Sequence, residues 1–200
     1  MRITLWPVPA DVAAAGVPVG YIGTSISTDL TGRDPQKAMP VLSYVGRQPL
    51  VDGREVNHKE VLGEPLAAEV ERISKRLFGT DYVAALSAAT GLNVRSLQRG
   101  RIVTHGLPVP ILLMLGRAVA TPCHQATGYA LLAAAAMWDA LLPEYGVGEQ
   151  GPGPMSAQGR ELLEVRMREI SERAVETVAE MREEAAAAKA RAYAAAGRIP

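Results

Sequence analysis

The segment from residue 157 to residue 196 constrains the fold most, because its apolar residues recur as they do on one face of a helix. The stripe comprises Leu163, Met167, Ile170, Ala174, Val178, Met181, Ala185, Ala188 and Ala192. Its steps of three and four residues form a repeat of about 11 residues, which favours nearly straight or slightly right-handed packing. Such a helix is roughly 60 Å long, longer than a small domain is wide. We expect residues 160–196 to mediate self-association, because an isolated helix buries no apolar stripe.

Glycine and proline divide the rest of the chain. Residues 1–64 contain many of both, and GPGP interrupts residues 143–159, which predicts an irregular N-terminal arm and a linker. The arm also holds an Asp-Gly pair in VDGRE (51–55), which is typical of a tight hairpin. Its short β-prone runs are Ile3–Trp6, Val17–Ser27, Val41–Val45 and Pro49–Val51. We therefore predict a partly β N-terminal region at 1–64, a helical core at 65–142, the linker, and an assembly helix at 160–200.

The predicted core is built from helices. Leu66, Val70, Ile73 and Leu77 fall on one face of residues 65–79, with Pro65 in the first turn and a glycine after the last. A second helix is expected over about 81–90, and a third follows Asn93. Two more are expected over 111–120 and about 125–142, the former apolar nearly all round and therefore buried. The fold class is mainly α.

Net charge and cysteine content point to few general functions. The 200 residues carry 21 basic and 21 acidic groups, so the net charge indicates neither a nucleic acid nor a membrane. Locally, however, residues 81–120 hold four arginines against a single acid. One cysteine excludes an internal disulfide and favours a reducing compartment, so we expect a cytoplasmic protein. The longest apolar run, Ala130–Met137, is too short to span a bilayer, and no signal peptide is evident.

The locally basic region contains the stretch AALSAATGLNVRSLQRG, residues 84–100. A helix of small residues precedes Gly91, which suits a turn, and Asn93 suits the N-cap of a following helix. Leu92 and Leu97 would face the core, and Ser87 lies where two helices would approach closely. Residues 81–120 resemble the helix-turn-helix of the lambda-repressor-like regulators of phages and plasmids. The resemblance covers about 40 of the 200 residues.

The resemblance implies a recognition helix that enters the major groove of duplex DNA. Arginine suits bidentate contacts to guanine and glutamine suits adenine. The residues expected to contact DNA are Asn93, Arg95, Gln98, Arg99 and Arg101. Gly100 departs from the pattern, because such motifs carry a bulky apolar or aromatic residue there. A glycine inside a helix costs about 1 kcal/mol of stability relative to alanine, so the helix that follows Asn93 is expected to be short.

The other motifs give weaker evidence of a functional site. Cys123 and His124 are adjacent in TPCHQ, but no second ligand pair completes a zinc site, so no metal is expected. GVPVGYIGTS (16–25) lacks both a dinucleotide-binding and a P-loop pattern, and is interpreted as turn chemistry. REVNHKE (54–60) places His58 near Glu55 and Glu60 without a nucleophile or metal to complete a site. We expect no cofactor and no enzymatic activity.

Two functions remain. The first is a duplex-DNA-binding protein, a phage or plasmid transcriptional regulator that acts as an oligomer in the host cytoplasm. The alternative is a structural assembly protein, such as a phage virion component, whose N-terminal arm and long helix make inter-subunit contacts. Neutral net charge and extended ends favour assembly. The local arginine excess and the glycine turn favour DNA binding.

Overall fold

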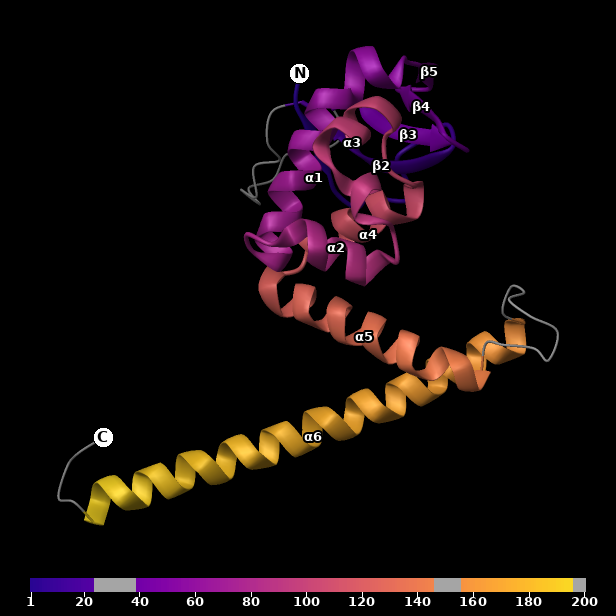
Figure 1. Cartoon of the computed structure of the whole chain (residues 1–200). Coiled ribbons are helices and arrows are strands. Elements are labelled where there is room, and N and C mark those ends of the chain that lie inside the picture. Colours follow the sequence, from indigo (N-terminus) through magenta and orange to yellow (C-terminus); the bar gives the residue numbers. More distant parts are fainter. Residues whose placement is uncertain (24–38, 146–155, 196–200) are drawn as a thin grey trace. The chain divides into compact units, whose positions relative to one another are not determined.

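The computed structural model of the protein (Figure 1) describes residues 1–23, 39–145 and 156–195. The chain divides into two compact units, Met1–Ala135 and Ala136–Pro200. The boundary falls inside helix α5, His124–Tyr145. The mainly helical class, with a small N-terminal sheet and a long C-terminal helix, is confirmed.

The N-terminal residues form an antiparallel sheet in which each strand pairs with the next along the chain. The strands are β1 Ile3–Leu5, β2 Val17–Ile22, β3 Val41–Val45, β4 Gln48–Val51 and β5 Arg54–Glu55. Val51 pairs with Arg54, so the connection between β4 and β5 is a two-residue turn. Asp52 and Gly53 both take positive φ, 48° and 75°, as a type I′ turn requires. The predicted Asp-Gly hairpin is therefore confirmed.

Six helical segments lie between the sheet and α5. They are η2 His58–Leu62, α1 Gly63–Phe78, α2 Tyr82–Thr90, η3 Val94–Leu97, α3 Arg99–His105 and α4 Val109–Val119. The helices expected over 65–79, 81–90, 111–120 and 125–142 correspond to α1, α2, α4 and α5. On α1, the four predicted apolar residues are all buried, which confirms the face assigned from their spacing.

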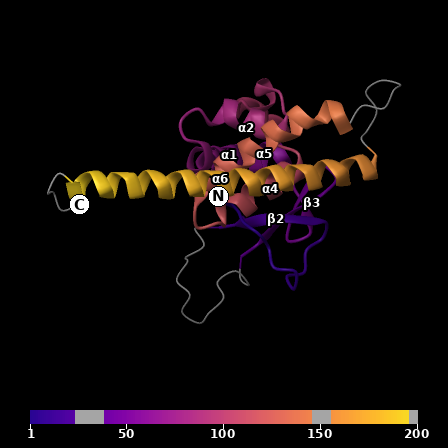
Figure 2. The same cartoon turned by 90° about the horizontal axis from the view of Figure 1, so that it is seen from below.

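Sheet and helices share one hydrophobic core. Figure 2 shows β2 and β3 on one side of α1, α2 and α4, and both α1 and α4 contact β1. Ile3 and Leu5 are fully buried in the same cluster as the apolar residues of α1 and α4. The backbone amide of Leu5 also donates to the buried carboxylate of Glu69 on α1, at 3.1 Å. The described residues of the range 1–64 are thus not the separate arm that glycine and proline suggested, because β1 completes the core of the helices.

The second unit contains α6, Ala157–Ala195, a helix of 39 residues. Ser171 lies 3.8 Å from the sulfur of Met137, so α6 contacts the last turns of α5. Farther along α6 the apolar stripe is open to solvent: Val178 is 55% and Met181 64% exposed. The predicted linker is shorter than expected, because 143–145 belong to α5 and 157–159 to α6. Of its remaining residues, Ser156 directly precedes α6, whereas 146–155 lie outside the described part of the chain, as do residues 24–27 of the predicted strand Val17–Ser27 and residue 196.

Within the described ranges, no single helix combines the length and apolar character that crossing a membrane demands. The pair α3 and α4, bent by 119°, meets the criterion by length and composition only. Its apolar side chains Ile102, Leu112 and Leu115 are buried in the core of the first unit.

Candidate nucleic-acid interface

The turn after α2 has the local structure that the sequence indicates. Gly91 ends the helix with φ at 69°, in the left-handed region that a glycine adopts without strain. The Ser87 hydroxyl donates to the carbonyl of Leu92 at 2.6 Å, which ties the chain back onto α2. The Asn93 side chain accepts from the backbone amide of Arg95 at 2.8 Å. The predicted glycine turn and asparagine cap are both confirmed.

The helix expected after Asn93 is not continuous. A 3₁₀ turn, η3, ends at Leu97, Gln98 is extended with φ −65° and ψ 138°, and α3 then begins at Arg99. Both Leu97 and Ile102 are buried, at 2% and 3% exposure. In an uninterrupted α-helix, residues five apart point about 140° away from each other. The break at Gln98 lets both side chains enter one core, and this is the physical reason that a single helix was the wrong expectation.

The five residues expected to contact DNA all lie on the surface. They are Asn93, Arg95, Gln98, Arg99 and Arg101, and all are exposed, whereas Leu92 packs against the core. In the part of the chain that the structure describes, the Arg95 and Gln98 side chains form no hydrogen bond or ion pair. Their donors and acceptors are therefore available to an external ligand.

Arg99 differs from the others because α1 holds its guanidinium. Nη2 lies 2.8 Å from a carboxylate oxygen of Glu64, and Nη1 lies 3.0 Å from one of Glu71. The hydrogen bond to Glu64 is the main cause that raises the pKa of Arg99. The pKa of Glu71 is lowered, first by its hydrogen bond from Lys75 and also by Arg99. Arg99 thus fastens α3 to α1.

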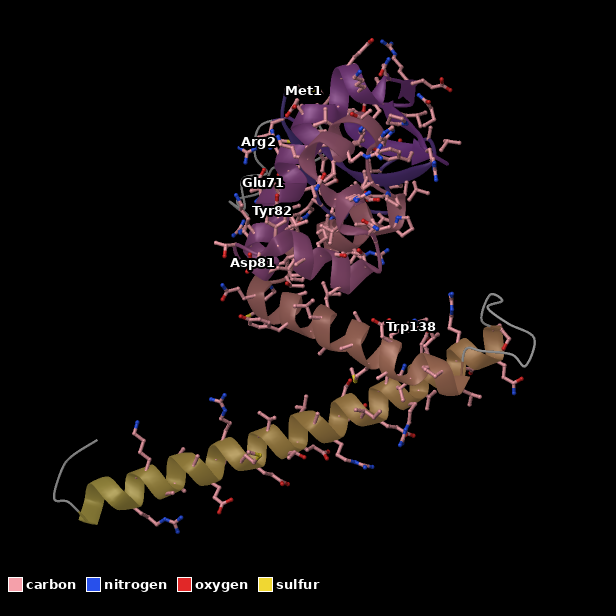
Figure 3. The ribbon with its side chains drawn as sticks, viewed as in Figure 1. Met1, Arg2, Glu71, Asp81, Tyr82 and Trp138 are labelled. Carbon is pink, nitrogen blue, oxygen red and sulfur yellow. The ribbon has the colours of Figure 1, made fainter. Side chains whose placement is uncertain are left out.

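The contacts continue along α1. Lys75 binds Glu71 at 2.6 Å, and its ammonium nitrogen lies 5.8 Å from the ring centroid of Tyr82 at the start of α2. Figure 3 shows Glu71, Tyr82 and Asp81 along one side of the first unit. Each of these surface contacts is weak alone, typically below about 1 kcal/mol. Together they join α1 to both α2 and α3, which sets the position of the candidate interface.

Beside α3 lies a groove of about 610 Å³ that the sequence did not indicate. Arg47 of the β3–β4 turn, His58 of η2, and Arg101 and His105 of α3 line it. The ring nitrogen Nε2 of His58 donates to the carbonyl of Ile102 at 3.0 Å. Because these residues come from three distant segments, no local pattern could have revealed the groove.

The described residues of the other motifs lie on separate elements: β5 and η2, the start of α5, and β2. In REVNHKE, His58 bonds to α3, while Glu55 and Glu60 are exposed. Cys123 is exposed and free. Across residues 1–23, 39–145 and 156–195, no three histidine, cysteine or acidic side chains gather as a metal site requires. Residues 17–22 of the glycine-containing motif form β2, and residues 24 and 25 lie outside the described ranges.

Comparison with known proteins gives no relative. No protein-family model, no curated protein and no solved structure matches this chain.

Proposed function

We propose that the protein binds duplex DNA through the surface formed by η3 and α3, and that it acts as an oligomeric transcriptional regulator of the phage or plasmid type. The observation that carries this proposal is that residues 92–102 divide into buried apolar side chains and exposed polar ones. Leu97 and Ile102 are buried, whereas Arg95 and Gln98 are exposed and unengaged among the described residues. A free arginine and a free glutamine beside a buried core offer hydrogen-bonding groups that match base edges and phosphates.

Within this proposal the five candidate residues have different roles. Arg95, Gln98 and Arg101 contact DNA, because their side chains are exposed at the interface. Asn93 caps η3. Arg99 positions α3, because two carboxylates on α1 already engage its guanidinium.

The experiment is duplex binding measured by fluorescence anisotropy over a range of salt concentrations, after selection of a preferred site from random duplexes. Binding that uses phosphate contacts weakens steeply with salt. Arg95→Ala and Gln98→Ala should each weaken binding to the selected site by about 1–3 kcal/mol. Arg117→Ala is the matched control, because Arg117 is exposed near the other end of α4. Equal effects of Arg95→Ala and Arg117→Ala would refute a specific interface.

A second experiment separates contact from positioning at Arg99. Glu64→Gln combined with Glu71→Gln removes both carboxylate partners of the Arg99 guanidinium, and with Glu71 also the partner of Lys75. If Arg99 positions α3, this double variant should bind DNA more weakly, in the same direction as Arg99→Ala. Tighter binding of the double variant, with weaker binding of Arg99→Ala, would instead make Arg99 a direct contact.

An assembly protein is the second candidate function, and one observation favours it. Val175, Val178 and Met181 on α6 are 70%, 55% and 64% exposed, and they form part of the apolar surface of a long helix. Self-association through α6 would cover this surface in either function. A protein that forms large assemblies and shows no salt-sensitive affinity for any duplex would support assembly over DNA binding.

A further inference from the structure

The groove beside α3 gathers groups that bind anions. Arg47 reaches it from the β3–β4 turn and Arg101 from α3, while no carboxylate is among the described residues that line it. The Arg47 side chain forms no ion pair or hydrogen bond within the described ranges. Guanidinium groups match the geometry of phosphate oxygens, which accept two parallel hydrogen bonds.

The two imidazoles of the groove are held in defined orientations. Arginine has only donors, so Nε2 of His105, 3.1 Å from Nη1 of Arg101, accepts a hydrogen bond. The neutral His105 ring therefore carries its proton on Nδ1 and can donate it. His58 is fixed by the hydrogen bond from its Nε2 to the Ile102 carbonyl. Its Nδ1 takes no part in that bond. Both rings add polar atoms beside the arginines.

Tyr44 supplies an independent observation. It lines the groove from β3 and is only 4% exposed. Its hydroxyl is buried and has no hydrogen-bond partner among the described residues. A buried hydroxyl without a partner costs free energy, and nearly all such groups in proteins are satisfied. Less than 1 Å² of the hydroxyl oxygen is accessible, so an anionic oxygen in the groove becomes its acceptor only when the side chains that cover it move aside.

We propose that the groove is a binding site for a phosphate group, which Arg47, Arg101 and the Tyr44 hydroxyl recognise. The phosphate belongs to a small phosphomonoester or to a nucleic-acid backbone, since both present the same oxygens. A volume of about 610 Å³ exceeds what inorganic phosphate needs, and Leu107 and Val109 provide apolar wall for the rest of a ligand. The site shares Arg101 with the proposed DNA surface, but phosphate binding in the groove does not require duplex binding.

The first test uses the full-length protein with inorganic phosphate, adenosine monophosphate and adenosine as probes. Binding is followed by calorimetry and by the ring resonances of His58 and His105. The two phosphate probes should bind and shift both histidines, whereas adenosine should not. Arg47→Ala should weaken phosphate binding about tenfold, as expected for a charge-assisted hydrogen bond. Arg117→Ala, which keeps the same net charge as Arg47→Ala, should have little effect.

Tyr44→Phe distinguishes a ligand contact from a packing role. It removes only the unpartnered hydroxyl, so the fold should keep or gain stability in the absence of ligand. Weaker binding of adenosine monophosphate by this variant, with unchanged thermal stability, supports the assigned contact. Unchanged affinity removes Tyr44 from the site.

Duplex DNA then identifies the source of the phosphate. If saturating adenosine monophosphate leaves duplex affinity unchanged, the groove holds a small phosphomonoester. If it competes with DNA, and Arg47→Ala lowers the salt slope of duplex binding by about one, the groove holds a backbone phosphate. Equal binding of adenosine and its monophosphate, or no phosphate binding together with an unchanged salt slope, would overturn the proposal. Absence of duplex binding alone would refute the proposed function and leave this site in place.

Discussion

The compact unit Met1–Ala135 and the helix α6 are stabilised in different ways. Helix α1 of the compact unit buries one whole face, including Leu66 and Val70, both fully inaccessible. Between residues 172 and 191, α6 exposes every side chain. It is supported by backbone hydrogen bonds and by surface pairs such as Arg166–Glu169, worth a few tenths of a kcal/mol each. Substitutions of buried residues in the compact unit therefore report on folding, and substitutions on the open part of α6 report on partners.

The largest effect is expected from Leu97→Ala in the compact unit. Leu97 is 2% exposed, so its truncation leaves a cavity and should lower the free energy of unfolding by about 2–5 kcal/mol. Val94→Ala, on the same 3₁₀ turn, is the control because Val94 is 45% exposed. Chemical denaturation measures both. Similar losses for the two variants would mean that Leu97 does not anchor the interface to the core.

An effect on the order of 2 kcal/mol is expected at alkaline pH. Burial raises the pKa of Tyr44 from 10.0 to about 12. A folded-state pKa above the unfolded one favours the protonated folded state, so this contribution is complete below pH 10 and disappears as pH rises to 12. Denaturation midpoints across this range measure it, and Tyr44→Phe should flatten the dependence. The same decline in Tyr44→Phe would assign the effect to another group.

A smaller gain is expected from Gly100→Ala. Gly100 lies in α3, and a Cβ there meets no atom of the described residues within 4 Å. The substitution should stabilise the compact unit by about 0.5–1 kcal/mol, because glycine loses more backbone freedom in a helix. Gly91→Ala should act oppositely, since its φ of 69° is unfavourable for alanine. If the thermal unfolding midpoints of the two variants shifted in the same direction, this explanation would be contradicted.

The smallest effect on stability is expected on α6. Val178→Glu should change the free energy of unfolding by less than about 0.5 kcal/mol, because the site is a solvent-exposed surface. It should nevertheless lower the mass in solution if the apolar stripe holds copies together. Ala179→Glu introduces the same carboxylate one residue away, outside the stripe, and should leave the mass unchanged. Mass measurement by light scattering would argue against self-association through the stripe if the two variants behaved alike.

Features set by neighbouring residues could be predicted from the sequence. The Asp52–Gly53 hairpin and the Asn93 cap depend on residues that lie within a few positions of one another. The buried face of α1 follows from the spacing of its apolar residues. In each case the information is local, so the expectation and the structure agree.

Features set by distant contacts could not be predicted. Arg99 finds its partners on α1, 28 and 35 residues away, so its side chain resembled a free DNA contact in the sequence. The break at Gln98 follows from the need to bury both Leu97 and Ile102, which is a property of the assembled core. Likewise the groove depends on the β3–β4 turn lying beside α3, and strand pairing decides that arrangement.

The bond between the Leu5 amide and the Glu69 carboxylate has a consequence for synthesis on the ribosome. These groups are separated by 64 residues. At about 5–20 residues per second, translation needs roughly 3–13 seconds to produce the second group after the first. Hairpins such as β3–β4 close between neighbouring residues, but β1 has no α1 to pack against during this interval. Strand β1 is therefore locked in place only after α1 has been made, and the nascent chain carries Ile3 and Leu5 uncovered by α1 until that helix leaves the exit tunnel.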